Sequence, residues 1–300
     1  MFSKSTWLHL RIPFSFFLMP VYLFALGISP NFSESRLIWS FIIVHFFLYP
    51  ASNGYNSYFD KDENSIGGLK NPPPVNKWLY YTSILFDFIA IALGFLKISM
   101  LFAAMLLLYG LVSKAYSHPS IRLKKFPFVG LFVVALFQGF FTFLLCYVGI
   151  NNFGLENLFN SRVLVPAALS SLILLGTYPM TQIYQHEEDA KRGDRTISIW
   201  LGIRGTFVFV LVVFTIAAAG YVFYFYTFYS LQYGLYFLVF LSPVVIYFLV
   251  WFFLVLREPS KANHRNTMRL NFISALCLNA FFIYFFLDSS QVLQAIKAGY

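Results

Sequence analysis

Long apolar runs, repeated along almost the whole chain, limit the folds open to this sequence more than any other feature. Each run holds about 20 predominantly apolar residues, the length that an α-helix needs to cross the hydrocarbon core of a bilayer. Backbone polar groups must be satisfied inside the bilayer, and such runs therefore fold as helices. The runs cover residues 12–29, 36–58, 78–97, 99–117, 127–149, 163–185, 205–228, 234–256 and 268–288. The sequence predicts an all-α polytopic membrane protein with nine transmembrane helices in a single domain over residues 1–300.

The composition agrees with this class. Hydrophobic residues make up 59% of the chain and charged residues 11%, whereas soluble domains carry about 25% charged residues. The apolar residues come in runs rather than in alternation, which argues against a transmembrane β-barrel. A net charge of +9 would suggest nucleic acid in a soluble protein, but here it fits loops that face anionic lipid. We therefore expect a lipid bilayer, and no nucleic acid, as the partner.

The distribution of Lys and Arg predicts the orientation of the helices. If nine spans alternate in direction, four of the 21 basic residues lie on one side of the membrane, and the remaining 17 lie on the side of the N-terminus. The four are Arg36, Lys97, Arg162 and Lys297. Basic residues concentrate in cytoplasmic loops. We therefore expect a multi-pass protein of the cell (inner) membrane, with its N-terminus in the cytoplasm and its C-terminus outside.

Two polar stretches interrupt the apolar sequence. Residues 53–76 follow the second run and residues 182–196 follow the sixth, which places both on the predicted cytoplasmic side. They hold seven of the twelve acidic residues: Asp60, Asp62, Glu63, Glu187, Glu188, Asp189 and Asp194. An acid at the end of a membrane helix is often only a solvated loop residue. Two matched clusters on one face of the membrane indicate instead a shared site.

The spacing of the polar residues points to a metal ion. Asn56, Asp60 and Asn64 are four residues apart, so they share one face if the second helix continues through them. Oxygen ligands of this kind suit Mg²⁺, and one or two carboxylates per helix suit an ion that also binds a phosphate. We therefore expect Mg²⁺ as the cofactor. The candidate ligands are Asn56, Asp60, Asn64, Gln185, Glu188 and Asp189.

Basic residues in the neighbouring connections fit a diphosphate ligand. A diphosphate needs both a metal ion and Lys or Arg side chains to offset its charge, and its departure as a leaving group needs the same stabilisation. Such residues also orient the chain in the membrane, so each one alone is a weak signal. The candidates are Lys114, Arg122, Lys124, Lys125, Lys191, Arg192 and Arg195.

The combination of these stretches resembles the UbiA-type membrane prenyltransferases. That family carries N-D-x-x-D-x-x-x-D after its second helix and D-x-x-x-D-x-x-x-G-x-x-T after its sixth. Here residues 56–64 read NSYFDKDEN and residues 185–196 read QHEEDAKRGDRT. Residues 116–125 (YSHPSIRLKK) are similar to the loop after the fourth helix in quinone- and chlorophyll-type members. The resemblance covers essentially the whole chain and implies nine helices around a central cavity.

The same resemblance implies an activity and roles for the residues. The activity is Mg²⁺-dependent transfer of an isoprenyl group from a polyprenyl diphosphate to an aromatic, quinone-precursor-like acceptor or to another hydrophobic lipid acceptor. Asp60, Asp189 and Lys114 are the implied catalytic residues, and Mg²⁺ would be held by Asn56, Asp60 and Asp189. The implied substrate-binding residues are Arg122, Lys124, Lys191, Arg195 and Tyr116.

The chain departs from the family pattern at Ser57, Asn64 and Gln185, which keep an oxygen atom but lack the acid's charge. A catalytically silent relative and a membrane transporter are therefore alternatives. A phosphotransferase that joins two lipid alcohols is another, but its acids would cluster in one long motif. Inside the third run, Asp87 either faces the cavity or hydrogen-bonds across helices.

Overall fold

The structure, a computed structural model, describes residues 3–291. The expected external C-terminus and Lys297 lie outside the described residues. Short helices begin and connect the bundle: α1 (Lys4–Leu10), η1 (Ile12–Phe17), α2 (Met19–Gly27), η3 (Leu123–Lys125), η5 (Leu155–Leu158), α10 (His186–Lys191) and η6 (Pro259–Lys261). The long segments are α3 (Glu34–Ile42), η2 (Ile43–Leu48) and α4 (Tyr49–Asp60), then α5 (Lys77–Lys97), α6 (Met100–Ser117), α7 (Pro127–Val134), η4 (Ala135–Phe141), α8 (Thr142–Asn151), α9 (Ser161–Gln182), α11 (Ile197–Phe228), α12 (Leu231–Arg257) and α13 (His264–Ser289).

The predicted all-helical membrane architecture is confirmed. Within residues 3–291, eight helices are long and apolar enough to cross a membrane, and a bent pair near the N-terminus makes the ninth. One predicted boundary differs clearly, because α11 begins at Ile197 rather than near residue 205. Gly202 interrupts this helix with a φ of 67° and a ψ of 170°, which places a short helical turn ahead of the membrane span. A positive φ of this kind is accessible to glycine at little cost.

The first span is broken rather than straight. The segment Lys4–Phe17 meets α2 at an angle of 42°. Arg11 ends α1 in a left-handed conformation, with a φ of 48°, and Pro13 follows in the first turn of η1. Proline offers no backbone N–H, so a continuous helix could not form a complete hydrogen-bond ladder here. The break lets α1 lie beside the end of α4 while α2 continues into the bundle.

A π-helical segment, η4, lets two spans pack backbone against backbone. The Ser171 hydroxyl on α9 donates to Ala135 O at 2.7 Å and accepts from Phe140 N at 3.0 Å. A Cβ atom on Gly139 would lie only 2.5 Å from the Cα atom of Ser171. The wide turn leaves backbone groups to be satisfied by a side chain of the neighbouring helix, and glycine allows the close approach.

The outside of the bundle is as apolar as its core. Buried rings pack in the centre, where Phe24 stacks on Phe282 with ring centroids 4.6 Å apart. Large apolar side chains also cover the outer face of α12, where Val239 and Phe253 are each 66% exposed. A surface of this kind is stable in lipid rather than in water. The protein is a multi-pass membrane protein.

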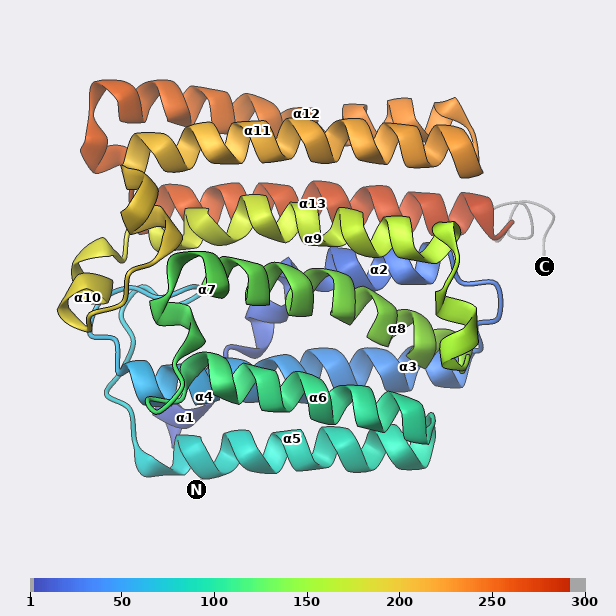
Figure 1. The fold of residues 1–300 in the computed structure, drawn as a ribbon, viewed down its shortest axis with the longest axis horizontal. Helices are drawn as coiled ribbons and strands as arrows, with labels where there is room; N and C mark the ends of the chain where they lie inside the picture. The colour runs from blue at the N-terminus through green and yellow to red at the C-terminus, as the bar shows by residue number, and fades with distance from the viewer. Residues whose placement is uncertain (1–2, 292–300) are drawn as a thin grey trace.

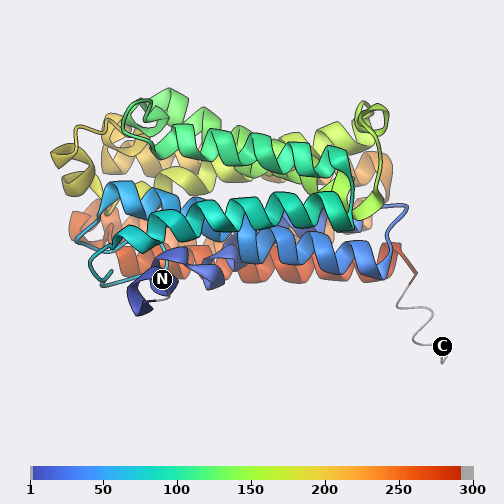
Figure 2. The same ribbon diagram turned by 90° about the horizontal axis from the view of Figure 1, so that it is seen from below.

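The two polar stretches lie at the same end of the helix bundle. In Figure 1, α10 and the loop that connects α4 to α5 both lie at the left-hand end, beside the start of α13. Figure 2, turned by 90°, shows them at the same end. The membrane spans between them in the sequence run to the far end and return, so they bring residues 53–76 and 182–196 together.

Candidate active site

The first half of the site stands on the last turn of α4. Asn56 and Asp60 are one turn apart there, and both line the main cavity of the bundle. The helix ends at Asp60, because Lys61 adopts a left-handed conformation with a φ of 50°. The expectation that the helix face continues to Asn64 is therefore wrong. Asn64 lies in the loop, exposed to solvent.

The second half of the site is formed by α10 and the turn that follows it. Asp189 and Arg192 are three residues apart on the same side, and the Arg192 Nη2 atom donates to Asp189 Oδ1 at 2.6 Å. Gly193, with a φ of 75°, then reverses the chain, and Asp194 N bonds back to Asp189 O at 2.9 Å. The tight turn places the Asp194 carboxylate beside Arg192, 3.5 Å from its Nε atom. A glycine after the helix end permits this reversal.

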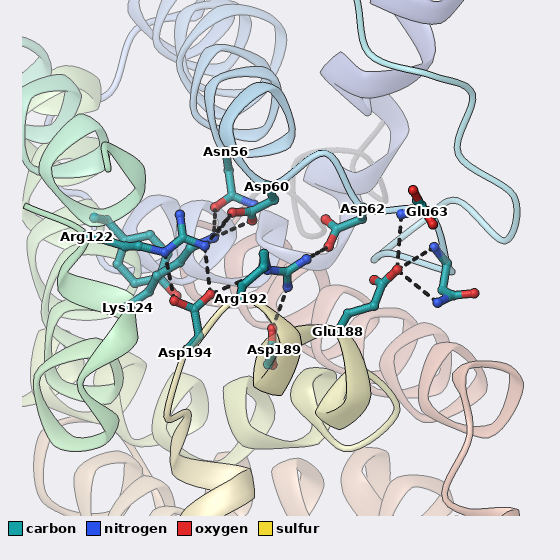
Figure 3. Close-up of polar contacts among 12 residues, drawn as sticks. Asn56, Asp60, Asp62, Glu63, Arg122, Lys124, Glu188, Asp189, Arg192 and Asp194 are labelled. Carbon is teal, nitrogen blue, oxygen red and sulfur yellow. Dashed lines mark hydrogen bonds and ion pairs between the residues drawn. The ribbon is translucent and has the colours of Figure 1, made fainter. Parts of the chain in front are cut away.

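Two arginines join the two halves, and a lysine binds the first half (Figure 3). The Arg192 Nη1 atom donates to Asp62 Oδ1 at 2.5 Å, across the gap between α10 and the loop after α4. Arg122 forms a forked pair with Asp194, with both distances 2.7 Å, and also lies 3.3 Å from Asp60 Oδ1. Lys124 binds the Asp60 carboxylate. Asp60 and Asp189 therefore belong to one connected network of ion pairs.

Lys124 also contacts the amide of Asn56. Its Nζ atom lies 3.2 Å from Asn56 Oδ1, which in addition accepts a hydrogen bond of 2.8 Å from the Ser117 hydroxyl. The oxygen of Asn56 is thus directed toward the cluster by α6 and by the loop after it. This oxygen and the Asp60 carboxylate face the same cation, as an ion with oxygen ligands would require.

Glu188 fastens the loop after α4 to α10. Its Oε1 atom accepts hydrogen bonds from Glu63 N at 3.1 Å, Asn64 N at 2.7 Å and Asn64 Nδ2 at 2.9 Å. Glu188 and Asn64, both expected as metal ligands, bind each other, and neither lines the cavity. Gln185, the residue before α10, does line it.

The cavity has a polar mouth and an apolar interior. Its volume is about 270 Å³. Asp60, Asp62, Lys124, Asp189 and Arg192 surround the mouth, all at the loop end of the bundle. Deeper in the bundle, the wall is made of aliphatic and aromatic side chains: Val21, Leu174, Tyr221, Leu278 and Phe282. The expected central cavity is thus confirmed, and its shape suits a ligand with one charged end and one hydrocarbon end.

Tyr116 forms part of the cavity wall between these two regions. It stands on the last turn of α6, and its hydroxyl lies 2.5 Å from the hydroxyl of Tyr178 on α9. The two rings connect helices from the two halves of the chain. They border the cavity where its polar mouth gives way to the apolar interior.

Four of the predicted cationic residues lie away from the cluster. Lys125 is exposed, and its Nζ atom lies over the ring of Phe126. Lys114 sits inside α6, where it pairs with Asp87 of α5 and lies over the ring of Tyr55. The two alternatives for Asp87 were a place at the cavity and a contact across helices. The structure shows the contact across helices, because Asp87 of α5 pairs with Lys114 of α6 and a charge buried between helices needs such a partner. Lys191 and Arg195 flank the site but are exposed, and neither lines the cavity.

The acids and bases around the mouth of the cavity balance each other. Four carboxylates, those of Asp60, Asp62, Asp189 and Asp194, face Arg122, Lys124 and Arg192, and Arg11 also lines the cavity close to Asp62 and Asp60, which gives a net charge of about zero. Burial raises the pKa of Asp189 to about 6, and burial together with the charge of Asp60 does the same for Asp62. Burial opposes the protonated form of Arg192, but the neighbouring carboxylates raise its pKa above the ordinary value.

These oxygen donors fit a divalent metal ion only in part. Within residues 3–291 no three or more His, Cys, Asp or Glu side chains converge closely enough to enclose an ion. Mg²⁺ commonly keeps waters and takes phosphate oxygens, and needs only one or two carboxylates. Buried carboxylates on both sides of the cavity mouth meet that need, and an ion there would give the cluster a net positive charge.

The sequence alone did not single out Arg192 and Asp194 as central residues. Arg192 contacts three carboxylates and Asp194 contacts two arginines, so together they join α10 to the rest of the site. One signal was available. Arg192 stands three residues after Asp189 and directly before a glycine, a spacing that favours an ion pair on the helix and a turn after it.

Comparison with known proteins gives a consistent result. The model of the UbiA prenyltransferase family matches residues 15–276. A UbiA homologue from Archaeoglobus fulgidus, solved with GPP and Mg²⁺, is 19% identical, with a TM-score of 0.65, over 94% of this chain and 99% of that one. The same homologue, solved with DMAPP and Mg²⁺, is 18% identical, with a TM-score of 0.66, over 95% of this chain and 99% of that one. A structure of digeranylgeranylglyceryl phosphate synthase is 20% identical, with a TM-score of 0.61, over 94% of this chain and 98% of that one. No curated protein matches the chain significantly.

Proposed function

Because this chain belongs to the UbiA prenyltransferase family, we propose that it transfers an isoprenyl group from a prenyl diphosphate to a hydrophobic acceptor within the membrane. One observation carries the proposal: carboxylates from both polar stretches, together with Lys124 and Arg192, surround the mouth of a cavity whose interior is apolar. A prenyl diphosphate has the same division, with a charged head and a hydrocarbon tail. Solved relatives bind GPP and DMAPP together with Mg²⁺.

The charge balance of the cluster supports a need for Mg²⁺. A diphosphate is strongly anionic, and a cluster whose cations are already paired with carboxylates offers it no excess positive charge. Asn56, Asp60 and Asp189 would hold the ion, with Asp62 and Gln185 close by on the cavity wall. When bound, Mg²⁺ supplies the positive charge that a departing diphosphate requires.

The protein's own cations would then hold the diphosphate. Lys124 and Arg192 line the mouth of the cavity, and Arg122 pairs with Asp60 and Asp194 beside it. A guanidinium group can bind a phosphate through two hydrogen bonds. Exposed Lys191 and Arg195 would attract the donor from outside. We propose a structural role for Lys114 in the membrane, because it pairs with Asp87.

In the reaction, the bond between the allylic carbon and the diphosphate oxygen breaks, and the diphosphate leaves with the electron pair. The same carbon forms a bond to a nucleophilic atom of the acceptor, which loses a proton. Tyr116, Tyr178 and Tyr221 line the cavity, and the faces of such rings stabilise positive charge that develops on the prenyl group. The dry interior excludes water that would otherwise consume it.

The acceptor is either an aromatic quinone precursor or a lipid alcohol such as a glycerol ether. Both are hydrophobic and would reach the cavity from the bilayer. The first would place the enzyme in quinone biosynthesis, and the second is the class suggested by the similarity to digeranylgeranylglyceryl phosphate synthase. We propose that the charged end of the bundle faces the cytoplasm, because most Lys and Arg residues lie there.

Release of pyrophosphate tests the proposal. Detergent-purified protein is given geranylgeranyl diphosphate, Mg²⁺ and, in separate reactions, a hydroxybenzoate, a hydroxynaphthoate or a glycerol lipid. We expect pyrophosphate release with one acceptor class, its loss on addition of EDTA, and a decrease of at least about 100-fold in Asp60→Asn and in Asp189→Asn. Glu187→Gln, an exposed acid on the same short helix as Asp189, is the matched control and retains activity.

Full activity in both aspartate variants would refute the proposed site. If the donor binds but no acceptor is turned over, the chain is a catalytically silent relative. Movement of the intact donor across a vesicle membrane would indicate the transporter alternative.

A further inference from the structure

A second cavity lies on the side of the bundle, outside the site described above. It is an open groove of about 920 Å³ between α12, the start of α13 and the loop of residues 61–76. We propose that this groove binds the phosphate headgroup of an anionic phospholipid, with an acyl chain along α13. The proposal concerns a separate ligand and does not depend on the prenyl-transfer reaction.

Unpaired positive charge is the first observation behind this inference. Lys70 from the loop and Arg265 and Arg269 from α13 line the groove. The two arginines are four residues apart, so they lie on one face of the helix. Within residues 3–291 none of the three forms an ion pair, and no Asp or Glu lines the groove. Three cations without carboxylates suit a phosphate group.

The apolar continuation of the groove distinguishes a lipid from a free anion. Phe272 and Ile273 line the groove beyond the two arginines along α13, and Met268 lines it between them. Phe272 is 53% exposed, although it belongs to a helix long and apolar enough to span the membrane. A free phosphate would leave this apolar surface uncovered, whereas an acyl chain would cover it. Basic pockets between membrane helices bind anionic headgroups for the same reasons.

The groove also connects to the loop that carries Asp62 to the main site. His264, the first residue of α13, lines the groove, and its Nε2 atom lies 3.0 Å from the carbonyl oxygen of Ile66. Ser65 lines the groove as well, and its hydroxyl donates to Lys70 O at 2.7 Å. A phosphate that bridges Lys70 to the arginines of α13 would therefore hold this loop against the bundle.

Lipid-dependent thermal stability tests the proposal. The unfolding midpoint of the detergent-purified chain is measured against increasing phosphatidylglycerol, with phosphatidylcholine as the neutral lipid. We expect the unfolding midpoint to rise with phosphatidylglycerol but not with phosphatidylcholine. We also expect Arg265→Gln/Arg269→Gln to raise the apparent dissociation constant about 25-fold, since each basic residue near an anionic surface contributes roughly fivefold. Lys4→Gln/Arg204→Gln removes two exposed charges outside the groove and is the control.

Two further measurements make the outcome decisive. Lys70→Gln, on the loop, is expected to weaken phosphatidylglycerol binding about fivefold. It replaces the arginine variant as the test if that variant does not fold. Hydrogen exchange of residues 61–76 is expected to slow when phosphatidylglycerol is added. An equal response of the wild type and both groove variants overturns the proposal. An equal response to inorganic phosphate also overturns it, because a free anion would then account for the binding.

Discussion

The Arg192→Gln substitution tests the electrostatic account of the site most directly. Arg192 is the only described side chain that contacts Asp62, Asp189 and Asp194 together, and it joins α10 to the loop after α4. The side chains of Asp62 and Asp189 are only 5% and 9% exposed, so loss of the guanidinium leaves two buried carboxylates without their main cation. Glutamine is similar in length and retains hydrogen-bonding groups.

The size of the effect follows from this burial. Removing one partner of a buried ion pair costs about 3–5 kcal/mol. The lower value applies here, because the Arg192 side chain is 20% exposed and a carboxyl with a pKa of about 6 can take up a proton instead. A loss of about 3 kcal/mol corresponds to a decrease of roughly 6 °C in the unfolding midpoint for a chain of this size.

The assay is thermal unfolding in detergent, followed by tryptophan fluorescence, for a double-mutant cycle. Adding Asp62→Asn to Arg192→Gln should recover part of the loss, since it removes one of the unpaired charges. Arg195→Gln, three residues further along and exposed, removes the same charge and should change the midpoint by less than about 1 °C. Equal midpoints for the Arg192 and Arg195 variants would refute the reasoning.

Two other predictions concern the membrane-embedded part of the bundle. Lys114→Met should destabilise the protein by about 3 kcal/mol, because Asp87 is left unpaired inside a span, and Asp87→Asn in the same chain should restore stability, as thermal unfolding would reveal. If the double variant is no more stable than Lys114→Met, the pair does not matter. Gly139→Ala should cost at least about 2 kcal/mol, because its Cβ would collide with the backbone at Ser171. Gly205→Ala, whose Cβ has room, should be neutral or stabilising in the same measurement.

Hydrophobicity was enough to predict the spans, because the length of an apolar run is set directly by the thickness of the bilayer. Local backbone geometry was harder to predict from the sequence. The break between α1 and η1 depends on Arg11 in a left-handed conformation, which sequence does not favour for arginine. The end of α4 has the same cause at Lys61, and it alone removes Asn64 from the predicted helix face.

The site was predictable in its composition but not in its pairings. The two acidic stretches could be placed at one end of the bundle by counting spans, and their residue types indicated a cation and a phosphate. Which cation meets which acid depends on a few ångströms of three-dimensional placement. Lys114 was expected beside the acids of the two polar stretches, but it pairs with Asp87. Arg192 contacts three carboxylates, because the glycine turn after it brings Asp194 close.

The anchoring of the loop between α4 and α5 has a consequence for how the protein is made. His9 near the N-terminus lies 2.8 Å from Pro73 O, Glu188 holds Asn64, and His264 at the start of the last span contacts Ile66 O. The residues that form these contacts are synthesised in order, so the contact between His264 and Ile66 can form only after α13 has been made. The loop that carries Asp62 therefore gains its last contact from the final helix. A partly synthesised chain in the membrane would hold its acidic loop open, and the site would mature only when synthesis reaches its final helix.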